Sequence, residues 1–197
     1  MKIELDENHK YSVDGKPYPG VTEILGGCGI IDDTWFTEQD AIRGTHIHMA
    51  CQYLDEGCLD RDTVDPLYLP YLMAYEKFLR ECKPKWEVIE FKVFNKDYLY
   101  AGTLDRFGTM FNEQCCVDLK SGTPQKWVGC QLSGYTQALA SMYFNTDGPF
   151  PSIDCRSKRY GLYLSKYGTY YLKEYNNRDD WRGFTAALNV WKWKHNK

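Results

Sequence analysis

The sequence lacks the long apolar segment that an integral membrane protein needs. Its apolar runs are broken within a few residues, whereas a membrane-spanning helix takes about 20 predominantly apolar residues. The first residues, MKIELD, alternate charged and apolar side chains and so differ from the apolar stretch of a signal peptide. We therefore expect a cytoplasmic protein that has no membrane partner.

Cysteine spacing of the kind that binds zinc or supports redox chemistry is also missing. The eight cysteines include no C-x-x-C pair, which is the usual mark of either kind of site. No tight trio of cysteines stands near the C-terminus, so we expect no iron–sulfur cluster. Reduced cysteines scattered through core and surface are the simpler interpretation.

The chain has no low-complexity tract, internal repeat or linker, and no G-x-x-x-x-G-K-[ST] phosphate-binding loop. Any step driven by ATP would therefore need a partner protein. Of the 197 residues, 43% are hydrophobic and 16% are aromatic, which is typical of a folded protein. The sequence predicts a single domain over residues 1–197 with a buried core.

Charge is divided unevenly along the chain, although the net charge is only −3. Residues 1–119 carry 12 Lys or Arg against 22 Asp or Glu, whereas residues 120–197 carry 12 against 5. Such asymmetry can give an acidic protein one basic surface, which suits a nucleic-acid partner. The alternative is that charges distant in sequence mix in space, so charge alone does not decide between them.

Hydrophobic patterning predicts an α/β fold with a mixed central sheet flanked by helices, preceded by a small N-terminal β-hairpin over residues 3–13. A short helix or strand is expected at residues 21–25. The longer expected helices cover residues 35–54, 66–82, 127–144 and 179–193. The expected central strands cover residues 86–94, 98–111, 114–121, 160–165 and 169–175.

Three charged residues fall on neighbouring strands of this central region. If Asn112 and Glu113 form a two-residue turn, Asp105 lies opposite Lys120 on the paired strand. Positions two apart on one strand share a face, so Asp118 joins Asp105 and Lys120 on one side of the sheet. A three-residue turn would reverse this parity, so the prediction depends on the turn.

Two carboxylates and an ammonium on one sheet face suit the hydrolysis of a phosphodiester. Carboxylate oxygens are hard ligands for Mg²⁺, which keeps coordination sites for water and phosphate oxygens. A nearby lysine can orient the attacking water or stabilise charge in the transition state. For an isolated D-x-K tripeptide, an ordinary salt bridge is the plainer interpretation. However, Asp118 follows the uncharged run QCCV, and charge at the end of a buried strand is costly unless it is paired or ligated.

Four short motifs follow one another along the chain. They are R-G-T-x-x-H at 43–48, G-x-x-D at 102–105, D-x-K-[ST]-G at 118–122 and Q-x-x-x-Y at 131–135. Together they resemble the RecB-type nuclease branch of the PD-(D/E)XK superfamily, which includes bacterial recombination nucleases, many phage exonucleases and nucleases of CRISPR spacer acquisition. The resemblance covers about residues 20–140 and implies a single nuclease domain with a restriction-endonuclease-like core.

The resemblance implies a role for each residue of the central motifs. Asp105 and Asp118 would bind the metal ion and take part in catalysis, and Lys120 would be the catalytic lysine. His48 and the carbonyl of Leu119 would be further ligands of a Mg²⁺ or Mn²⁺ ion.

Other residues would support this centre. Glu90, on the preceding strand, is a candidate extra ligand. Arg43, Ser121, Gln131 and Tyr135 would contact DNA or brace the site, and the last two share a helix face because they are four residues apart.

Two positions allow another interpretation. His46 competes with His48 as a ligand, but two residues apart on a helix they cannot point the same way. A histidine packed on its helix is the alternative for His48. Leu104 stands where the name of the superfamily places proline, a departure that leaves the chemistry intact.

By resemblance, the protein would be a metal-dependent DNA exonuclease acting on strand ends in recombination, repair or replication. It would be encoded by a phage or prophage and work in the cytoplasm of the bacterial host, with a recombination or helicase partner supplying any unwinding. Two alternatives stay open. One is an endonuclease of the same fold, which would need a base-reading element or a dimer interface. The other is a catalytically silent member that binds DNA or protein as a scaffold.

Basic and aromatic residues in the last third of the chain suggest a path for DNA. The basic residues that would contact phosphates are Arg156, Lys158, Arg159, Lys166 and Lys173. The aromatic residues that would stack on bases are Trp127, Tyr160, Tyr163, Tyr167 and Tyr170. For many of these tyrosines, burial in the core is the plainer interpretation.

Overall fold

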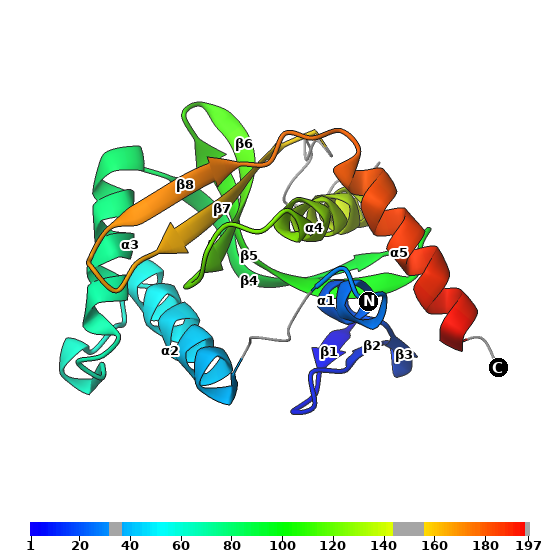
Figure 1. Cartoon of the computed structure of the whole chain (residues 1–197), viewed down its shortest axis with the longest axis horizontal. Helices are drawn as coiled ribbons and strands as arrows, with labels where there is room; N and C mark the ends of the chain where they lie inside the picture. Colours follow the sequence, from blue (N-terminus) through cyan, green and yellow to red (C-terminus); the bar gives the residue numbers. More distant parts are fainter. Residues whose placement is uncertain (32–36, 144–155, 196–197) are drawn as a thin grey trace.

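The structure is a computed structural model that describes residues 1–31, 37–143 and 156–195. It is an α/β fold in which a mixed five-stranded sheet is flanked by helices, with a separate three-stranded antiparallel sheet at the N-terminus (Figure 1). The fold class that the sequence predicts is therefore confirmed.

The N-terminal sheet has one strand more than the predicted hairpin. Its strands are β1 (Ile3–Leu5), β2 (Tyr11–Val13) and β3 (Lys16–Tyr18). Asp14 and Gly15, with φ of 48° and 78°, form the turn that brings β3 alongside β2. Pro17 weakens the sequence signal for β3, but proline is tolerated on an edge strand, which β3 is.

The central sheet has the strand order β4-β5-β6-β7-β8. Its strands are β4 (Lys85–Asn95), β5 (Tyr100–Met110), β6 (Glu113–Lys120), β7 (Lys158–Leu164) and β8 (Tyr170–Glu174). Neighbouring strands are antiparallel except β6 and β7, which are parallel. A parallel pair needs a long crossover, and α4 (Trp127–Tyr143) lies in that connection.

The other helices are α1 (Val21–Gly27), α2 (Glu38–Asp55), the short 3₁₀ helix η1 (Arg61–Thr63), α3 (Leu69–Cys82) and α5 (Asp180–His195). The side chain of Thr37 caps α2 by accepting a hydrogen bond from the amide of Asp40. Trp35 and Phe144, where the sequence predicts the start of α2 and the end of α4, lie outside the described residues. In residues 1–31, 37–143 and 156–195, no helix is long and apolar enough to cross a membrane.

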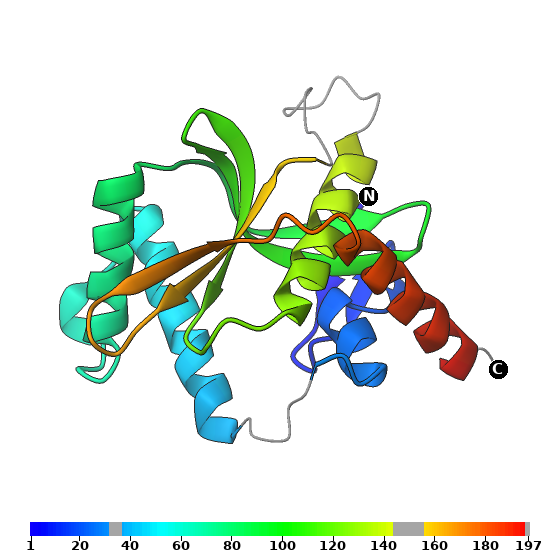
Figure 2. The ribbon, with the colours of Figure 1, turned by 45° about the horizontal axis from the view of Figure 1, so that its top comes forward.

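Two apolar cores lie on opposite faces of β6. Cys116 packs with residues of α1, α4 and α5, whereas Val117 and Leu119 pack with residues of α2 and α3. Figure 2 shows the same division, with α2 and α3 on one side of the molecule and α1, α4 and α5 on the other. Since side chains alternate along a strand, Asp118 and Lys120 project on the side of α4.

The turn between β5 and β6 falls one residue earlier than predicted. Phe111 and Asn112, with φ of 54° and 62°, form the two-residue turn, while Glu113 already belongs to β6. Such a turn needs left-handed backbone at both positions, which a Phe-Asn pair does not suggest strongly. The register therefore shifts by two residues, and Lys120 does not lie opposite Asp105 as predicted. A shift of two keeps each side chain of β6 on its predicted face.

Candidate metal centre

The pairing of β5 with β6 stops where the charged residues begin. The last paired residues are Arg106 and Val117, and beyond them the amide of Leu119 donates to the Asp105 carboxylate at 2.6 Å. The Asp105 side chain thus takes the place of a backbone acceptor on the neighbouring strand. This contact fixes one carboxylate oxygen and satisfies an amide that burial would otherwise leave unpaired.

Glu90 reaches the same point from β4 through a distorted backbone. Its φ of 47° is left-handed, a conformation that costs a residue other than glycine about 1–3 kcal/mol. The flanking residues Ile89 and Phe91 still pair with β5. The Glu90 carboxylate accepts a hydrogen bond from Nη1 of Arg106 at 2.9 Å. A strained charged residue held by a buried partner is typical of a functional site.

His48 completes the group from α2. Its Nε2 lies 3.1 Å from the carbonyl oxygen of Leu119, and its Nδ1 lies 3.6 Å from both Asp105 Oδ2 and Glu90 Oε1. One ligand atom from each of His48, Glu90 and Asp105 lies within 4.8 Å of the others, so among the described residues this group could hold a metal ion. The Leu119 carbonyl, predicted to be a ligand, lies in contact with the histidine beside this group. A hydrogen bond from Nε2 to that carbonyl turns Nδ1 toward the carboxylates.

The charges in this group shift its titration. Burial lowers the pKa of His48, but the carboxylates of Asp105 and Glu90 outweigh this effect and raise the pKa to about 9. Burial raises the pKa of Asp105, an effect that His48 opposes and Glu90 reinforces. Two carboxylates drawn together with an imidazole attract a proton, or a cation that replaces it.

Asp118 and Lys120 form a second charged group beside the first. Their side chains, two residues apart on β6, make an ion pair of 2.6 Å. Burial raises the pKa of Asp118 to about 6, which Lys120 opposes and Asp105 reinforces. Burial lowers the pKa of Lys120, but its carboxylate neighbours raise it overall, so this lysine keeps its proton. Asp118, predicted to bind the metal, is thus held by Lys120 and stands outside the group of three.

Arg106 organises the opposite side of the centre, and the sequence did not predict it. Its side chain is fully buried. Nε donates to Asp55 at 2.7 Å, while Nη1 donates to Glu90 and to the carbonyl of Asp105. The hydroxyl of Tyr75 also donates to Asp55 at 2.7 Å. In the sequence, the available signal for Arg106 was an arginine inside a buried strand. Its partner Asp55 is 51 residues away along the chain, and so distant a partner leaves no local pattern.

Gly102 of the G-x-x-D motif makes room for Tyr135 on α4. A Cβ at Gly102 would lie 2.7 Å from the Tyr135 ring, so any larger residue would displace that ring. The side-chain amide of Gln131 donates to the Tyr135 hydroxyl at 3.2 Å, which confirms that the two share a helix face. With exposures of only 4% and 6%, Gln131 and Tyr135 brace the sheet more than they offer an open DNA surface.

The other predicted contacts lie at the edges of the centre. Arg43 pairs with Asp40 at 2.6 Å within the first turns of α2. Ser121 is half-buried and directly follows β6. His46 is exposed and stacks on Tyr68, with 5.2 Å between ring centroids, away from the metal group as helix geometry predicts.

Two of the basic residues predicted to contact DNA form ion pairs within the protein. Lys158 pairs with Glu174 at 2.8 Å, and Arg159 pairs with Asp180 at 3.2 Å. Of the tyrosines proposed to stack on bases, the buried ones are Tyr160 and Tyr163, and the most exposed one is Tyr167. The core interpretation therefore applies to some of these tyrosines, and the path as a whole stays a prediction.

Comparison of the sequence with models of known protein families finds no match, and a search of curated proteins finds none either. The chemistry of the centre therefore has to be argued from its donors. Three side chains that could hold a cation stand beside a carboxylate and a protonated lysine. Such a set can bring a divalent ion and an anionic group together and stabilise negative charge between them.

Proposed function

We propose that the protein is a metal-dependent nuclease that hydrolyses phosphodiester bonds of DNA. One observation carries the proposal: His48, Glu90 and Asp105 converge within 4.8 Å, beside the ion pair of Asp118 and Lys120. A cation centre next to a fixed ammonium suits a phosphodiester, because the transition state gathers more negative charge than one cation neutralises well.

The donor set favours Mg²⁺ or Mn²⁺. Two carboxylate oxygens suit either ion, and the imidazole nitrogen of His48 adds a ligand that Mn²⁺ accepts more readily than Mg²⁺ does. When bound, such an ion would acidify a water molecule and offset charge on a phosphate oxygen.

The side chains of the protein have separable tasks in this proposal. Lys120 stays protonated, so it donates from Nζ to a phosphate oxygen and does not act as a base. While it pairs with Lys120, Asp118 has a pKa raised by burial to about 6, and it can accept a proton when Lys120 turns to the substrate because loss of that cation raises its pKa further. Arg106 holds the Glu90 carboxylate in place through its buried hydrogen bond.

The wider assignment rests on the motifs. Their order along the chain, with a mixed sheet flanked by helices, supports membership of the PD-(D/E)XK superfamily. The RecB-type likeness favours an exonuclease that acts on DNA ends in recombination, repair or replication. It also favours a phage or prophage origin and work in the bacterial cytoplasm beside a recombination or helicase partner.

The test is cleavage of end-labelled linear DNA and closed circular DNA in Mn²⁺, Mg²⁺ or EDTA. We expect shortening of the linear DNA only when a divalent ion is present, and loss of this activity in Lys120→Ala. Lys126→Ala is the matched control, because Lys126 is an exposed lysine in the loop after β6.

Other outcomes redirect or refute the proposal. Cutting of closed circles would identify an endonuclease. DNA binding without cleavage in any metal would identify a silent binding module. Equal cleavage by Lys120→Ala and Lys126→Ala would refute the assigned site. Calorimetric titration with Mn²⁺ adds a check on Glu90: Glu90→Gln should bind the ion more weakly than the unaltered protein.

A further inference from the structure

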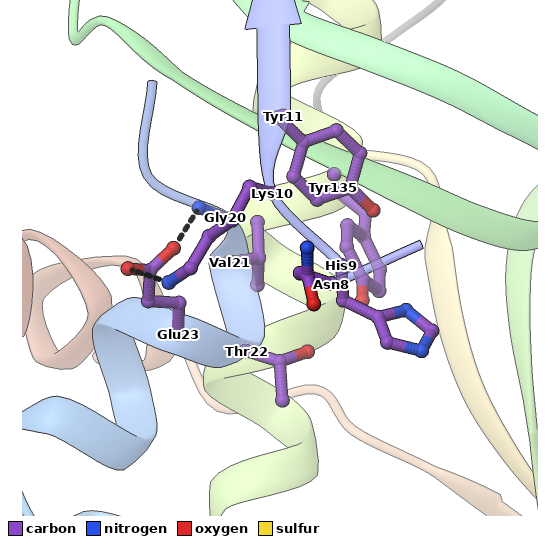
Figure 3. Close-up of a pocket in the computed structure, with 10 residues that line it drawn as sticks. Asn8, His9, Lys10, Tyr11, Gly20, Val21, Thr22, Glu23 and Tyr135 are labelled. Carbon is purple, nitrogen blue, oxygen red and sulfur yellow. Dashed lines mark hydrogen bonds and ion pairs between the residues drawn. The ribbon is translucent and has the colours of Figure 1, made fainter. Parts of the chain in front are cut away.

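A cavity of about 400 Å³ opens between the N-terminal sheet, α1 and α4, a volume within the range of about 300–1,000 Å³ typical of ligand sites. Its lining comes from the loop between β1 and β2, the first turn of α1, β5 and α4. The lining residues that carry the argument are Asn8, His9, Lys10, Tyr11, Thr22 and Tyr135. Figure 3 shows Asn8, His9, Thr22 and the Tyr135 hydroxyl on one side of the cavity, with Lys10 and Glu23 on the other.

The cavity adjoins the metal centre. The Tyr11 hydroxyl lies 2.9 Å from the Thr103 hydroxyl, and Thr103 precedes Asp105 by two residues on β5. Two residues of a strand span roughly 7 Å. Tyr135 lines the cavity and packs over Gly102 of the same strand. A strand whose phosphate lay at the metal centre could therefore place a neighbouring nucleotide in the cavity.

One buried side chain, Gln131, positions two hydroxyl groups of the cavity. The side-chain amide of Gln131 donates to the hydroxyls of Thr22 and Tyr135, at 3.4 Å and 3.2 Å. Both hydroxyl oxygens therefore act as acceptors for this one amide. A hydroxyl that accepts a hydrogen bond still has its own hydrogen to donate, so each can also serve a ligand as donor. The buried Oε1 of the same Gln131 side chain has no hydrogen-bond partner among the described residues.

The charge of the lining favours a neutral ligand group. The ammonium of Lys10 is paired with Glu23 at 2.7 Å, and the other Glu23 oxygen accepts a hydrogen bond from the Gly20 amide. A phosphate would have to compete with Glu23 for that lysine. A nucleobase offers neutral donors and acceptors along its edge and an apolar face for an aromatic side chain.

We propose that this cavity receives one unpaired base of the substrate strand, on a nucleotide neighbouring the phosphate at the metal centre. The inference rests on the proposed nuclease function and adds to it a subsite for a single-stranded base. Asn8 and Thr22 provide the hydrogen bonds to the edge of the base, and the ring of Tyr11 provides an apolar wall.

The test uses single-stranded oligonucleotides in which one abasic residue is moved along the strand. Binding is measured with Lys120→Ala protein to prevent cleavage, and KM and kcat are measured with protein that has Lys120. We expect one abasic position to weaken binding by about tenfold, the scale of one base contact. Asn8→Ala and Thr22→Val should bind the normal strand more weakly and show a reduced abasic effect at that position.

Matched controls and outcomes make the result decisive. Asn189→Ala and Thr185→Val on α5 should leave the abasic profile unchanged. Asn8 lies on an exposed loop, so its variant should fold normally, and circular dichroism and thermal melts would verify both variants. The inference is overturned if Asn8→Ala leaves the abasic profile as in the unaltered protein, or weakens intact and abasic strands equally. If the unaltered protein neither binds nor cleaves DNA, the nuclease proposal fails as well, whereas cleavage with an unchanged profile refutes the base subsite alone.

Discussion

The hairpin of β5 and β6 has two ends that differ in kind. At the turn end, the strands pair regularly and the charged Glu113 is exposed. At the open end, pairing stops after Arg106 and Val117, and a side-chain carboxylate satisfies the next amide. The turn has the left-handed residues Phe111 and Asn112, whereas beside the open end the left-handed residue is Glu90 of the neighbouring strand β4, next to the buried Asp105. Left-handed backbone without buried charge therefore belongs to a turn here, whereas left-handed backbone beside buried charge belongs to the candidate site.

Breaking the buried charge network should have the largest effect on stability. We expect Arg106→Leu to lower the free energy of unfolding by about 3–5 kcal/mol, because it leaves Asp55 and Glu90 without their guanidinium. Arg80→Leu on the exposed side of α3 is the control and should change stability little. Urea unfolding of the two variants measures the difference, and similar midpoints would contradict the role of the network.

Removing one charge at the open end should act on activity. Asp105→Asn keeps an oxygen acceptor for the Leu119 amide but removes a negative ligand from the metal group. Since loss of a supporting residue around a metal ligand costs about 10–100-fold, loss of a ligand charge should lower cleavage by more than about 100-fold. Glu113→Gln makes the same change at the turn end and should leave cleavage intact. Equal activity of both variants would remove the distinction between the two ends.

The open end should also confer a pH dependence on stability in the absence of metal. The folded protein raises the pKa of His48 from 6.5 to about 9, so His48 contributes stability that is fully present below pH 6.5 and is lost as pH rises through 9. In EDTA, the free energy of unfolding should fall over this window, and His48→Gln should flatten the fall. Asp118 does not interfere, because its raised pKa of about 6 lies below the window. A fall of equal size in both proteins would assign the effect to other groups.

The smallest effect is expected at the turn. Phe111 is an exposed residue with φ of 54°, which asparagine adopts more easily. Phe111→Asn should raise the free energy of unfolding by about 0.5–1 kcal/mol, measured by urea denaturation, without changing cleavage. Lower stability in this variant would mean that the Phe111 side chain contributes more through packing than its backbone costs.

The sequence predicts much of the fold because its elements are patterned locally. The alternation of apolar and polar residues locates the ends of β4, β5 and β6 to within two residues. Asp118 and Lys120 lie on the predicted face of β6 although the turn was predicted one residue too late. Strand β3, which was not predicted, and the turn at Phe111 depend on backbone conformations that these residue types do not indicate.

The candidate centre is predictable only in part. The motifs locate His48, Asp105 and Lys120, since each motif is a short local string. They do not show that His48 contacts the Leu119 carbonyl or that Arg106 holds Glu90. These contacts join residues from different elements, so they depend on how α2 packs on the sheet and how β4 pairs with β5.

The contact between His48 and Leu119 has a consequence for the order of folding. It joins residues 71 positions apart, so the centre forms only after α2 docks on a completed β6. Contacts between distant segments form late, because closing a long loop costs entropy before the contacts contribute stabilising free energy. Until β6 is in place, a growing chain therefore carries separate carboxylates that bind a metal ion weakly, so the candidate metal centre is assembled only when the chain is almost folded.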